Sequence, residues 1–361
     1  MVYWQDGELV FENYALRKQV HAAPTACSIL DYCGKWRTFG EIAGFLREYS
    51  ESSVLRNLQE LCANGLLERS DRKGDYRIAA VNRWAGWSPA ASFFHFSTKD
   101  VEFAPDPMEA IRRLQQRAKY EPMPLPLKEY PAAKRFRLPR VKTHGEFPSV
   151  LRERRTWRMY GRESVSLDKM AQTLELTFGI QGWVHLPGLG RAAMKTSPSG
   201  GALHPIEAYV LVQRVQGLKP GIYHYRAEGH ELEWMREGIA RPVLERNLGN
   251  QWWFARSAFL VLMTAVVGRM QWKYDYARAY RVLLAEAGHL GQTFCLTATW
   301  LGLAPFCTMA QMDTKWEEWL GIDGVVETIV YVLGAGTRPE QMRDAHIGMI
   351  RKGKAPPARR R

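Results

Sequence analysis

Hydrophobic and polar residues alternate in the first part of the chain with periods that change from segment to segment. Residues 8–14 alternate as a strand does, and apolar residues then recur at helical spacing over 24–33 and 52–67. Between these two stretches, Thr38 is followed three residues later by Glu41, the pattern of a capping box at a helix N-terminus. This part of the chain is therefore predicted to hold one strand followed by three helices.

A polar turn over 71–74 and the following residues 76–79 are predicted to form a small hairpin. Three helices with such a wing are typical of a winged-helix domain, which we place at residues 1–85. Winged helices bind DNA through a helix rich in polar and basic side chains, or bind peptides along a strand or a helix groove. The third helix carries Arg56 but also Glu60, so the DNA signal is weak and a peptide-binding module remains the alternative.

The next part of the chain, residues 86–150, has a mixed pattern. A helix is predicted over 107–121, and residues 121–142 are rich in proline and basic side chains. Proline disfavours helical backbone at the residue before it, so the second stretch is expected to be extended. We interpret 86–150 as a connecting segment that ends in a proline-rich, basic linker.

Residues 151–345 combine helical and strand-like periods, which predicts an α+β domain with a sheet flanked by helices. No G-x-G-x-x-G follows a predicted strand, so a Rossmann dinucleotide site is not expected. Helices are predicted over 167–179 and 280–301, and strands over 206–213, 221–235, 259–267 and 327–336.

The net charge of +13 is concentrated in two short stretches. Residues 351–361 (RKGKAPPARRR) and 134–142 (KRFRLPRVK) carry most of it and contain no acidic residue. We expect residues 346–361 to be a solvated, disordered basic tail, which argues against nucleic acid as a partner. The rest of the chain is close to neutral.

Membrane, disulfide and zinc-site classes find no support in the sequence. The longest apolar run, FLVLMTAVV at 259–267, is far shorter than the ~18 residues that span a bilayer. No signal-like start is present, so a cytoplasmic protein without membrane contact is expected. The five cysteines are odd in number and form no CxxC pair, and Glu286 with His289 lacks a further metal ligand. No metal is therefore predicted, and packing or hydrogen bonding is expected for Glu286 and His289.

Two segments offer groups that suit a phosphate. The stretch RRTWRMY contains three arginines and a hydroxyl, and guanidinium groups bind phosphate through charged, bidentate hydrogen bonds. LGAGTRP at 333–339 ends a predicted strand with Arg338 as a second candidate. A solvated basic face and a strand-end turn are the respective alternatives. The candidate residues in RRTWRMY are Arg154, Arg155, Thr156 and Arg158.

Two further segments could hold a flat ring through their backbone. SPSGGALHP at 197–205 combines prolines, which fix φ, with glycines, which permit close approach. WLGLAP at 300–305 follows the long predicted helix and could direct backbone N–H groups at a ring nitrogen. A structural turn and a helix C-cap are the alternatives. The candidate residues are Pro198, Ser199, Gly200 and Gly201 in the first segment and Gly302 and Leu303 in the second.

Lys273 and Tyr274 stand side by side just before the long predicted helix. A cationic amine beside a phenol is suited to removing or relaying a proton in an organic substrate. The pair is therefore the candidate for acid–base chemistry, and the sequence does not decide which of the two is the base.

At the level of motifs, the chain resembles the SagB-type dehydrogenases, FMN-dependent azoline oxidases within the nitroreductase-like superfamily. The resemblance covers nearly the whole chain. It is carried by LVFENYALR, GWSPAASFFHFSTKD, MKTSPSGGALHPIEAYV, PGIYHY and KYDYARAYRVLLAEAGH.

The resemblance implies a nitroreductase-like FMN domain, with a central mixed or antiparallel sheet, behind an N-terminal winged-helix domain that resembles a peptide-binding module. It implies that Arg154, Thr156, Arg158 and Arg338 bind the phosphate, and that Lys273 and Tyr274 are the catalytic pair. It also implies ring contacts from Pro198, Ser199, Gly200 and the segment around Gly302.

The implied activity is oxidation of thiazoline or oxazoline rings in a precursor peptide to thiazoles or oxazoles, as part of the biosynthesis of modified peptides. A homodimer with flavin sites at its interface and a cyclodehydratase partner are implied as well. The alternatives are FMN-dependent oxidation of another peptide or carrier-bound substrate, a general NAD(P)H nitroreductase, and a winged-helix DNA-binding regulator.

Overall fold

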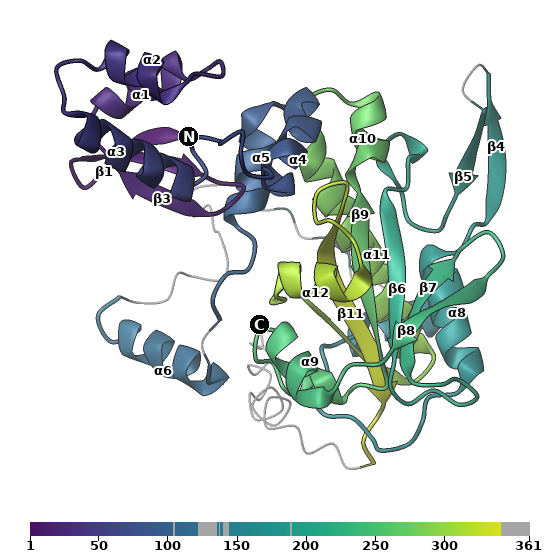
Figure 1. The fold of residues 1–361 in the computed structure, drawn as a ribbon. Coiled ribbons are helices and arrows are strands. Elements are labelled where there is room, and N and C mark those ends of the chain that lie inside the picture. Colours follow the sequence, from purple (N-terminus) through teal and green to yellow (C-terminus); the bar gives the residue numbers. More distant parts are fainter. Residues whose placement is uncertain (104, 122–135, 137, 140–143, 188–189, 341–361) are drawn as a thin grey trace. The chain divides into compact units, whose positions relative to one another are not determined.

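The computed structural model describes residues 1–103, 105–121, 136, 138–139, 144–187 and 190–340. These form two compact units, shown with the chain coloured from its N-terminus in Figure 1. One unit contains Met1–Lys99 together with Gln271–Tyr280, and the other contains Asp100–Met270 and the described residues from Arg281 onward. The expected linker over 121–142 and the tail over 346–361 lie largely or wholly outside the described residues.

The first unit begins with an antiparallel sheet of three strands, β1 (Val2–Gln5), β2 (Glu8–Asn13) and β3 (Lys18–His21), in that order. Asp6 and Gly7 link β1 to β2 with positive φ angles of 51° and 85°, as a two-residue hairpin turn requires. The predicted strand over 8–14 is confirmed by β2.

Three helices follow the sheet: α1 (Thr25–Tyr32), α2 (Phe39–Phe45) and α3 (Glu51–Ala63). The capping box is present, since Thr38 N–H donates to Glu41 Oε2 (2.7 Å) and Glu41 N–H donates to Thr38 Oγ1 (3.3 Å). The helices pack around a shared apolar core of Ile29, Ile42, Leu46, Val54 and Leu61.

The predicted hairpin at 76–79 is wrong, because these residues belong to helix α4 (Tyr76–Val81). Asp75 caps this helix by accepting the backbone N–H of Arg77 on its carboxylate at 2.9 Å. The stretch RIAAV after it contains no turn residue that would oppose a helix. The strands of this unit all precede its helices, and a winged helix is not confirmed.

The unit is completed by the 3₁₀ segment η1 (Asn82–Trp87), helix α5 (Ser88–Ser97) and the distant segment Gln271–Tyr280. Trp84 and Trp87 are fully buried, with ring centroids 5.4 Å apart. His95 Nδ1 lies 2.9 Å from the Tyr280 hydroxyl, so buried aromatic and polar groups attach the distant segment to the first 99 residues.

The second unit is built on a six-stranded, antiparallel sheet, and its central strand is buried on both faces. Phe259 meets Phe294 of the long helix α11 (Ala279–Trp300), with ring centroids 6.1 Å apart, whereas Leu260 belongs to the cluster on the other face with Trp316. This explains the unbroken apolar run of this strand, β9 (Phe259–Val266). The strand order is β10 (Leu303–Thr308), β11 (Glu327–Thr337), β9 (Phe259–Val266), β6 (Ile206–Val212), β7 (Gly221–Arg226), β8 (Glu231–Glu237).

The four predicted strand ranges correspond to five of the six strands of this sheet, since 221–235 contains both β7 and β8, and the two predicted helices are also present. The hairpin of β4 (Gly182–Leu186) and β5 (Gly190–Met194), and the strand β10, were not predicted. Helix α10 (Val267–Lys273) ends at one of the candidate residues, Lys273. The other helices are α6 (Pro107–Arg117), α7 (Glu146–Glu153), α8 (Leu167–Phe178), α9 (Arg241–Asn247), α11 (Ala279–Trp300) and α12 (Asp313–Leu320).

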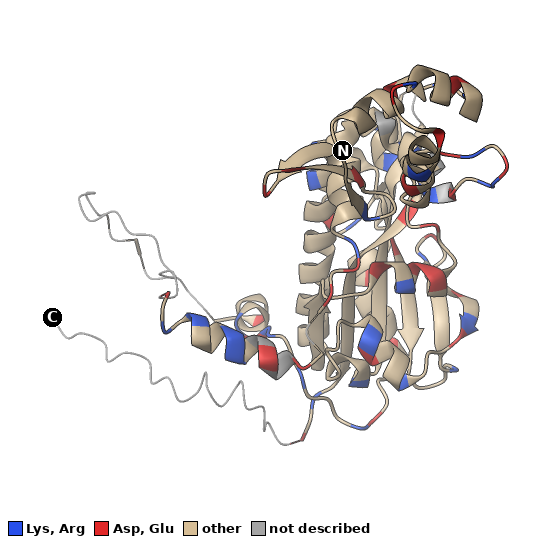
Figure 2. Ribbon diagram, turned by 60° about the vertical axis from the view of Figure 1, so that its left-hand side comes forward, with Lys and Arg blue, Asp and Glu red and all other residues tan. Residues whose placement is uncertain are grey.

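Figure 2 shows basic and acidic residues interspersed along the described ribbon. Helix α6, which confirms the helix predicted over 107–121, pairs Arg113 with Glu109 and Arg117 with Glu121 one turn apart. Across the described ranges, no helix is both long enough and apolar enough to cross a bilayer.

Candidate functional site

Arg338 lies at the C-terminal end of α11. Its guanidinium group donates hydrogen bonds to the carbonyl oxygens of Thr299 (2.9 Å) and Leu303 (3.1 Å). It also lies 5.7 Å from the centre of the Trp157 ring, within range of a cation–π contact. Arg338 therefore links the 154–158 stretch to the end of α11.

The 154–158 stretch directly follows α7 and lies beside β10. The backbone N–H of Trp157 donates to the carbonyl oxygen of Pro305 at 3.0 Å. The ring Nε1 of Trp157 is buried and has no hydrogen-bond partner among the described residues. Three predicted segments, containing Trp157, Pro305 and Arg338, thus meet at one end of α11. The candidates that flank Trp157 are half-buried: Arg154, Arg155, Thr156 and Arg158.

Gly302 is exposed and forms the turn between α11 and β10, with a φ of 74° that favours glycine, whereas Leu303 is buried. A Cβ placed on Gly302 would have one described neighbour within 4 Å, Nζ of Lys169 at 4.0 Å. The backbone is therefore open to a ligand on this side. Lys169, from the first turn of α8, adds a positive charge that sequence reasoning missed.

A pair of thiols, Cys295 and Cys307, lies within reach of the charge of Arg154. The pKa of Cys307 is lowered to about 6, chiefly because Cys295 donates a hydrogen bond to it, and burial only partly opposes this. Hydrogen bonding from Tyr331 and the charge of Arg154 lower it further. Guanidinium, ammonium and buried N–H groups are donors that fit a phosphate monoester.

The 197–205 loop packs against α11, where Ser197 Oγ lies 2.8 Å from Thr293 Oγ1 and Ser199 and Gly200 lie beside the first half of the helix. Ser199 donates a hydrogen bond from its hydroxyl to Glu286 Oε2 at 2.7 Å. A Cβ at Gly200 would lie 2.5 Å from Cγ1 of Val282, so a larger residue does not fit here without movement. Close approach of backbone to the helix is therefore the reason for glycine at this position. The remaining predicted loop residues differ in setting: Pro198 is exposed, and Gly201 has a φ of 67°.

Glu286 is a carboxylate buried beneath this loop. Its pKa is raised to about 7 because burial disfavours the charged form, although hydrogen bonds from Ser199 and the Gly200 N–H and the nearby Lys195 act in the opposite direction. Burial also lowers the pKa of Lys195 and of His204. The sequence placed Glu286 on a helix face with His289 and did not reveal its contact with the loop.

The Gly200 end of the loop and Arg338 lie toward opposite ends of α11. Val282, beside Gly200, and Thr299, beside Arg338, are separated by about 25 Å along the helix axis at ~1.5 Å per residue, whereas Ser197 of the loop reaches Thr293, only six residues before Thr299.

Lys273 and Tyr274 lie in the first unit, at the end of α10. The Nζ atom of Lys273 is 5.7 Å from the centre of the Tyr274 ring, so the two side chains are neighbours as their sequence suggests. The backbone oxygen of Tyr274 accepts a hydrogen bond from Nε1 of Trp87 at 2.7 Å. Lys273 is exposed and Tyr274 is half-buried.

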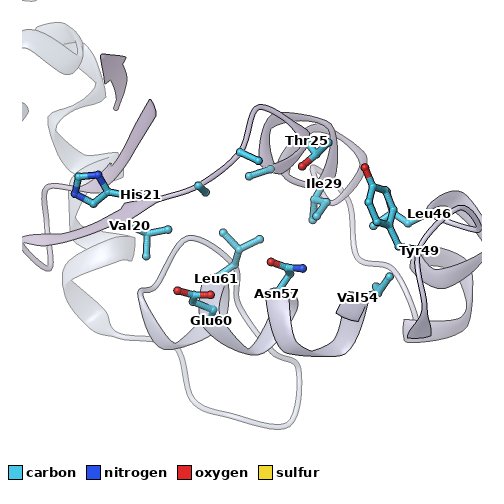
Figure 3. Close-up of a pocket in the computed structure, with 13 residues that line it drawn as sticks. Val20, His21, Thr25, Ile29, Leu46, Tyr49, Val54, Asn57, Glu60 and Leu61 are labelled. Atoms are coloured by element: carbon cyan, nitrogen blue, oxygen red, sulfur yellow. The ribbon is translucent and has the colours of Figure 1, made fainter. Parts of the chain in front are cut away.

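The first unit also contains a groove of about 210 Å³ between the β3 end of the sheet and helices α1 and α3 (Figure 3). β3 is an edge strand, since it pairs with β2 alone among the described strands. The floor of the groove is apolar, with Val20, Ile29, Leu46, Val54 and Leu61, and its polar lining includes His21, Thr25, Asn57 and Glu60.

Comparison with known proteins assigns the larger part of the chain to a family. The family model described as the nitroreductase family matches residues 151–337, just over half of the chain. TfxB, a trifolitoxin-processing protein of Rhizobium leguminosarum bv. trifolii, is 30% identical over 173 residues, which are 45% of this chain and 45% of TfxB. The chain thus spans less than half the length of this relative.

The similarity of two further proteins extends beyond that region. The trifolitoxin operon protein TfxC, from the same organism, is 23% identical over 310 residues, 80% of this chain and 83% of TfxC. A chain of the E. coli microcin synthetase McbBCD complex with truncated pro-MccB17 bound has a TM-score of 0.50 and 20% identity. That match covers 75% of this chain and all of the other, and shows a likeness of fold.

Proposed function

The chain belongs to the nitroreductase family, and from this premise we propose that it is an FMN-dependent dehydrogenase that oxidises thiazoline or oxazoline rings of a precursor peptide to thiazoles or oxazoles. The observation that carries the proposal is the meeting of Trp157, Gly302 and Arg338 at one end of α11. The similarity to TfxB, a trifolitoxin-processing protein, supports a processing role.

The phosphate of FMN would be held by Arg154, Arg158 and Arg338, with Lys169 nearby. The ring would contact the 197–205 loop and the backbone at Gly302. Because Gly200 and Arg338 contact α11 at points about 25 Å apart along its axis, we propose a homodimer in which each copy completes the other's site. Symmetric pairing of identical chains is the commonest way to form such a shared site.

The reaction removes two hydrogens from adjacent carbons of the azoline ring. When bound, FMN supplies the acceptor for the hydride and is reoxidised by dioxygen or another acceptor. Tyr274 or Lys273 takes up the proton that leaves the α-carbon. The proximity of the two side chains supports a shared role in this step.

Peptide recognition is assigned in this proposal to the groove beside β3. An extended peptide can add to an edge strand through backbone hydrogen bonds while apolar side chains enter a groove. The apolar floor and polar lining fit such a segment. The azoline would be supplied by a cyclodehydratase, since dehydrative ring closure must precede oxidation.

The first test is the visible spectrum of the purified chain, which should show flavin bands. Lys273→Ala and Tyr274→Phe should then abolish azole formation from an azoline peptide while the protein keeps its FMN. Lys219→Ala is the matched control, because Lys219 also lies over an aromatic ring, 4.9 Å from the centre of Trp234. Loss of flavin in both variants would make the pair structural, and rapid bleaching by NADPH would favour a general nitroreductase.

A further inference from the structure

The 197–205 loop contains backbone conformations that need external support. Gly201, Ala202 and His204 have positive φ angles of 67°, 57° and 41°. A non-glycine residue with such a φ is strained, and the strain persists where the surrounding contacts determine the conformation. The loop therefore depends on the groups that hold it.

The contacts of the Ser199–Gly200 end of the loop converge on one side chain of α11. Ser199 Oγ donates to Glu286 and at the same time accepts the backbone N–H of His204 at 2.9 Å. The N–H of Gly200 also donates to Glu286. One carboxylate thus fixes two neighbouring residues of the loop directly and a third, strained residue through Ser199.

Other groups around the carboxylate are too distant or engaged elsewhere to replace it. His204 Nδ1 is 3.9 Å from Glu286 Oε1, and His204 Nε2 is 2.9 Å from the carbonyl oxygen of Ala193. Arg269 donates to the carbonyl oxygen of His204 at 2.8 Å and pairs with Glu207. Glu286 is therefore the acceptor on which the Ser199–Gly200 end of the loop relies.

We propose that Glu286 is a positioning residue that holds the 197–205 loop in the conformation required for ring binding. The consequence for ring binding rests on the proposed function, whereas the clamping of the loop can be tested without a flavin. A side chain only 3% exposed does not reach a ligand, so its effect passes through Ser199 and Gly200.

Three variants separate the contributions of reach and charge. Glu286→Gln keeps the length of the side chain but provides one acceptor oxygen instead of two. Glu286→Asp keeps the charge but withdraws it by one methylene. Ser199→Ala removes one contact without leaving a charge unpaired. The matched control is Glu317→Gln. Glu317 is 4% exposed and likewise accepts from a hydroxyl, that of Thr328 at 2.7 Å, at a distance from the loop.

Hydrogen exchange of the flavin-free, full-length protein is the first measurement. The backbone amides of Gly200 and His204 should exchange about tenfold faster in each Glu286 variant, the effect of losing one charged hydrogen bond. Glu317→Gln should leave both amides unchanged. Unchanged exchange in the Glu286 variants, or equal acceleration in Glu317→Gln, would overturn the clamp.

Fluorescence titration with FMN is the second measurement. The same Glu286 variants should bind FMN about tenfold more weakly, with Glu317→Gln like wild type. If exchange accelerates but no form of the protein binds FMN, the proposed function fails and the clamp stands. If exchange accelerates while FMN affinity is unchanged, the link between the loop and the ring is refuted. Should Glu286→Gln not fold, Ser199→Ala gives the same two readouts.

Discussion

Replacing Gly200 by alanine tests how closely the 197–205 loop must approach α11. The new Cβ would lie 2.5 Å from Cγ1 of Val282 and 3.5 Å from Cε of Met270. Carbon atoms in contact are about 3.5–4.0 Å apart, so the loop has to move by roughly 1 Å. Val282 cannot turn its methyl group aside, because a β-branched residue has one strongly preferred rotamer in a helix. We expect a cost of about 1–3 kcal/mol, the usual range for overpacking.

The assay compares Gly200→Ala, Val282→Ala and the double variant by urea unfolding and by FMN titration. Val282→Ala alone should have little effect, since the side chain is 37% exposed. The double variant should recover most of the stability and of the FMN affinity, because the colliding methyl group is gone. A double variant as impaired as Gly200→Ala would refute the steric explanation. An unimpaired Gly200→Ala would refute the close packing itself.

Three further predictions concern other parts of the molecule. Arg338→Ala should weaken FMN binding about tenfold or more in a fluorescence titration, whereas Arg236→Ala, which also stacks on a tryptophan and donates to a carbonyl, should not. Asn57→Trp should fill the groove and lower the affinity for a labelled substrate peptide in fluorescence anisotropy, and Arg56→Trp, the next residue on α3, should not. The pKa of Glu286 is raised to about 7, against 4.5 in an unfolded chain. Its stabilising contribution is therefore fully present below pH 4.5 and is lost as the pH rises through 7. The free energy of unfolding should fall by about 3 kcal/mol over this range. The difference in unfolding free energy between wild type and Glu286→Gln should fall by this amount, and a difference independent of pH would contradict it.

Local patterns in the sequence were enough to find the elements whose faces are strongly apolar or capped. The family recognised from the motifs is confirmed by the match over 151–337. The helix α8 and the buried strand β9 follow from periodicity, and the capping box at Thr38 is present as predicted. The hairpin predicted at 76–79 is wrong because the polar turn before it leads into a helix, which Asp75 caps, and not into a strand.

The site residues could be suggested singly but their grouping could not. Arg338 binds carbonyl groups at Thr299 and Leu303, and this contact exists only after β11 pairs with β10. The link from Ser199 to Glu286 crosses 87 residues of sequence and leaves no periodic signal. Long-range pairing of this kind depends on the fold, so the phosphate end, the loop and the separation between them had to come from the structure.

The attachment of Gln271–Tyr280 to the first 99 residues has a consequence for how this protein can evolve. Trp87 holds the backbone of Tyr274, and His95 contacts the hydroxyl of Tyr280. A recombination event that exchanged only the N-terminal residues would therefore place new neighbours around Lys273 and Tyr274. The N-terminal unit and this pair are therefore expected to be inherited together, although 171 residues of sequence separate Lys99 from Gln271.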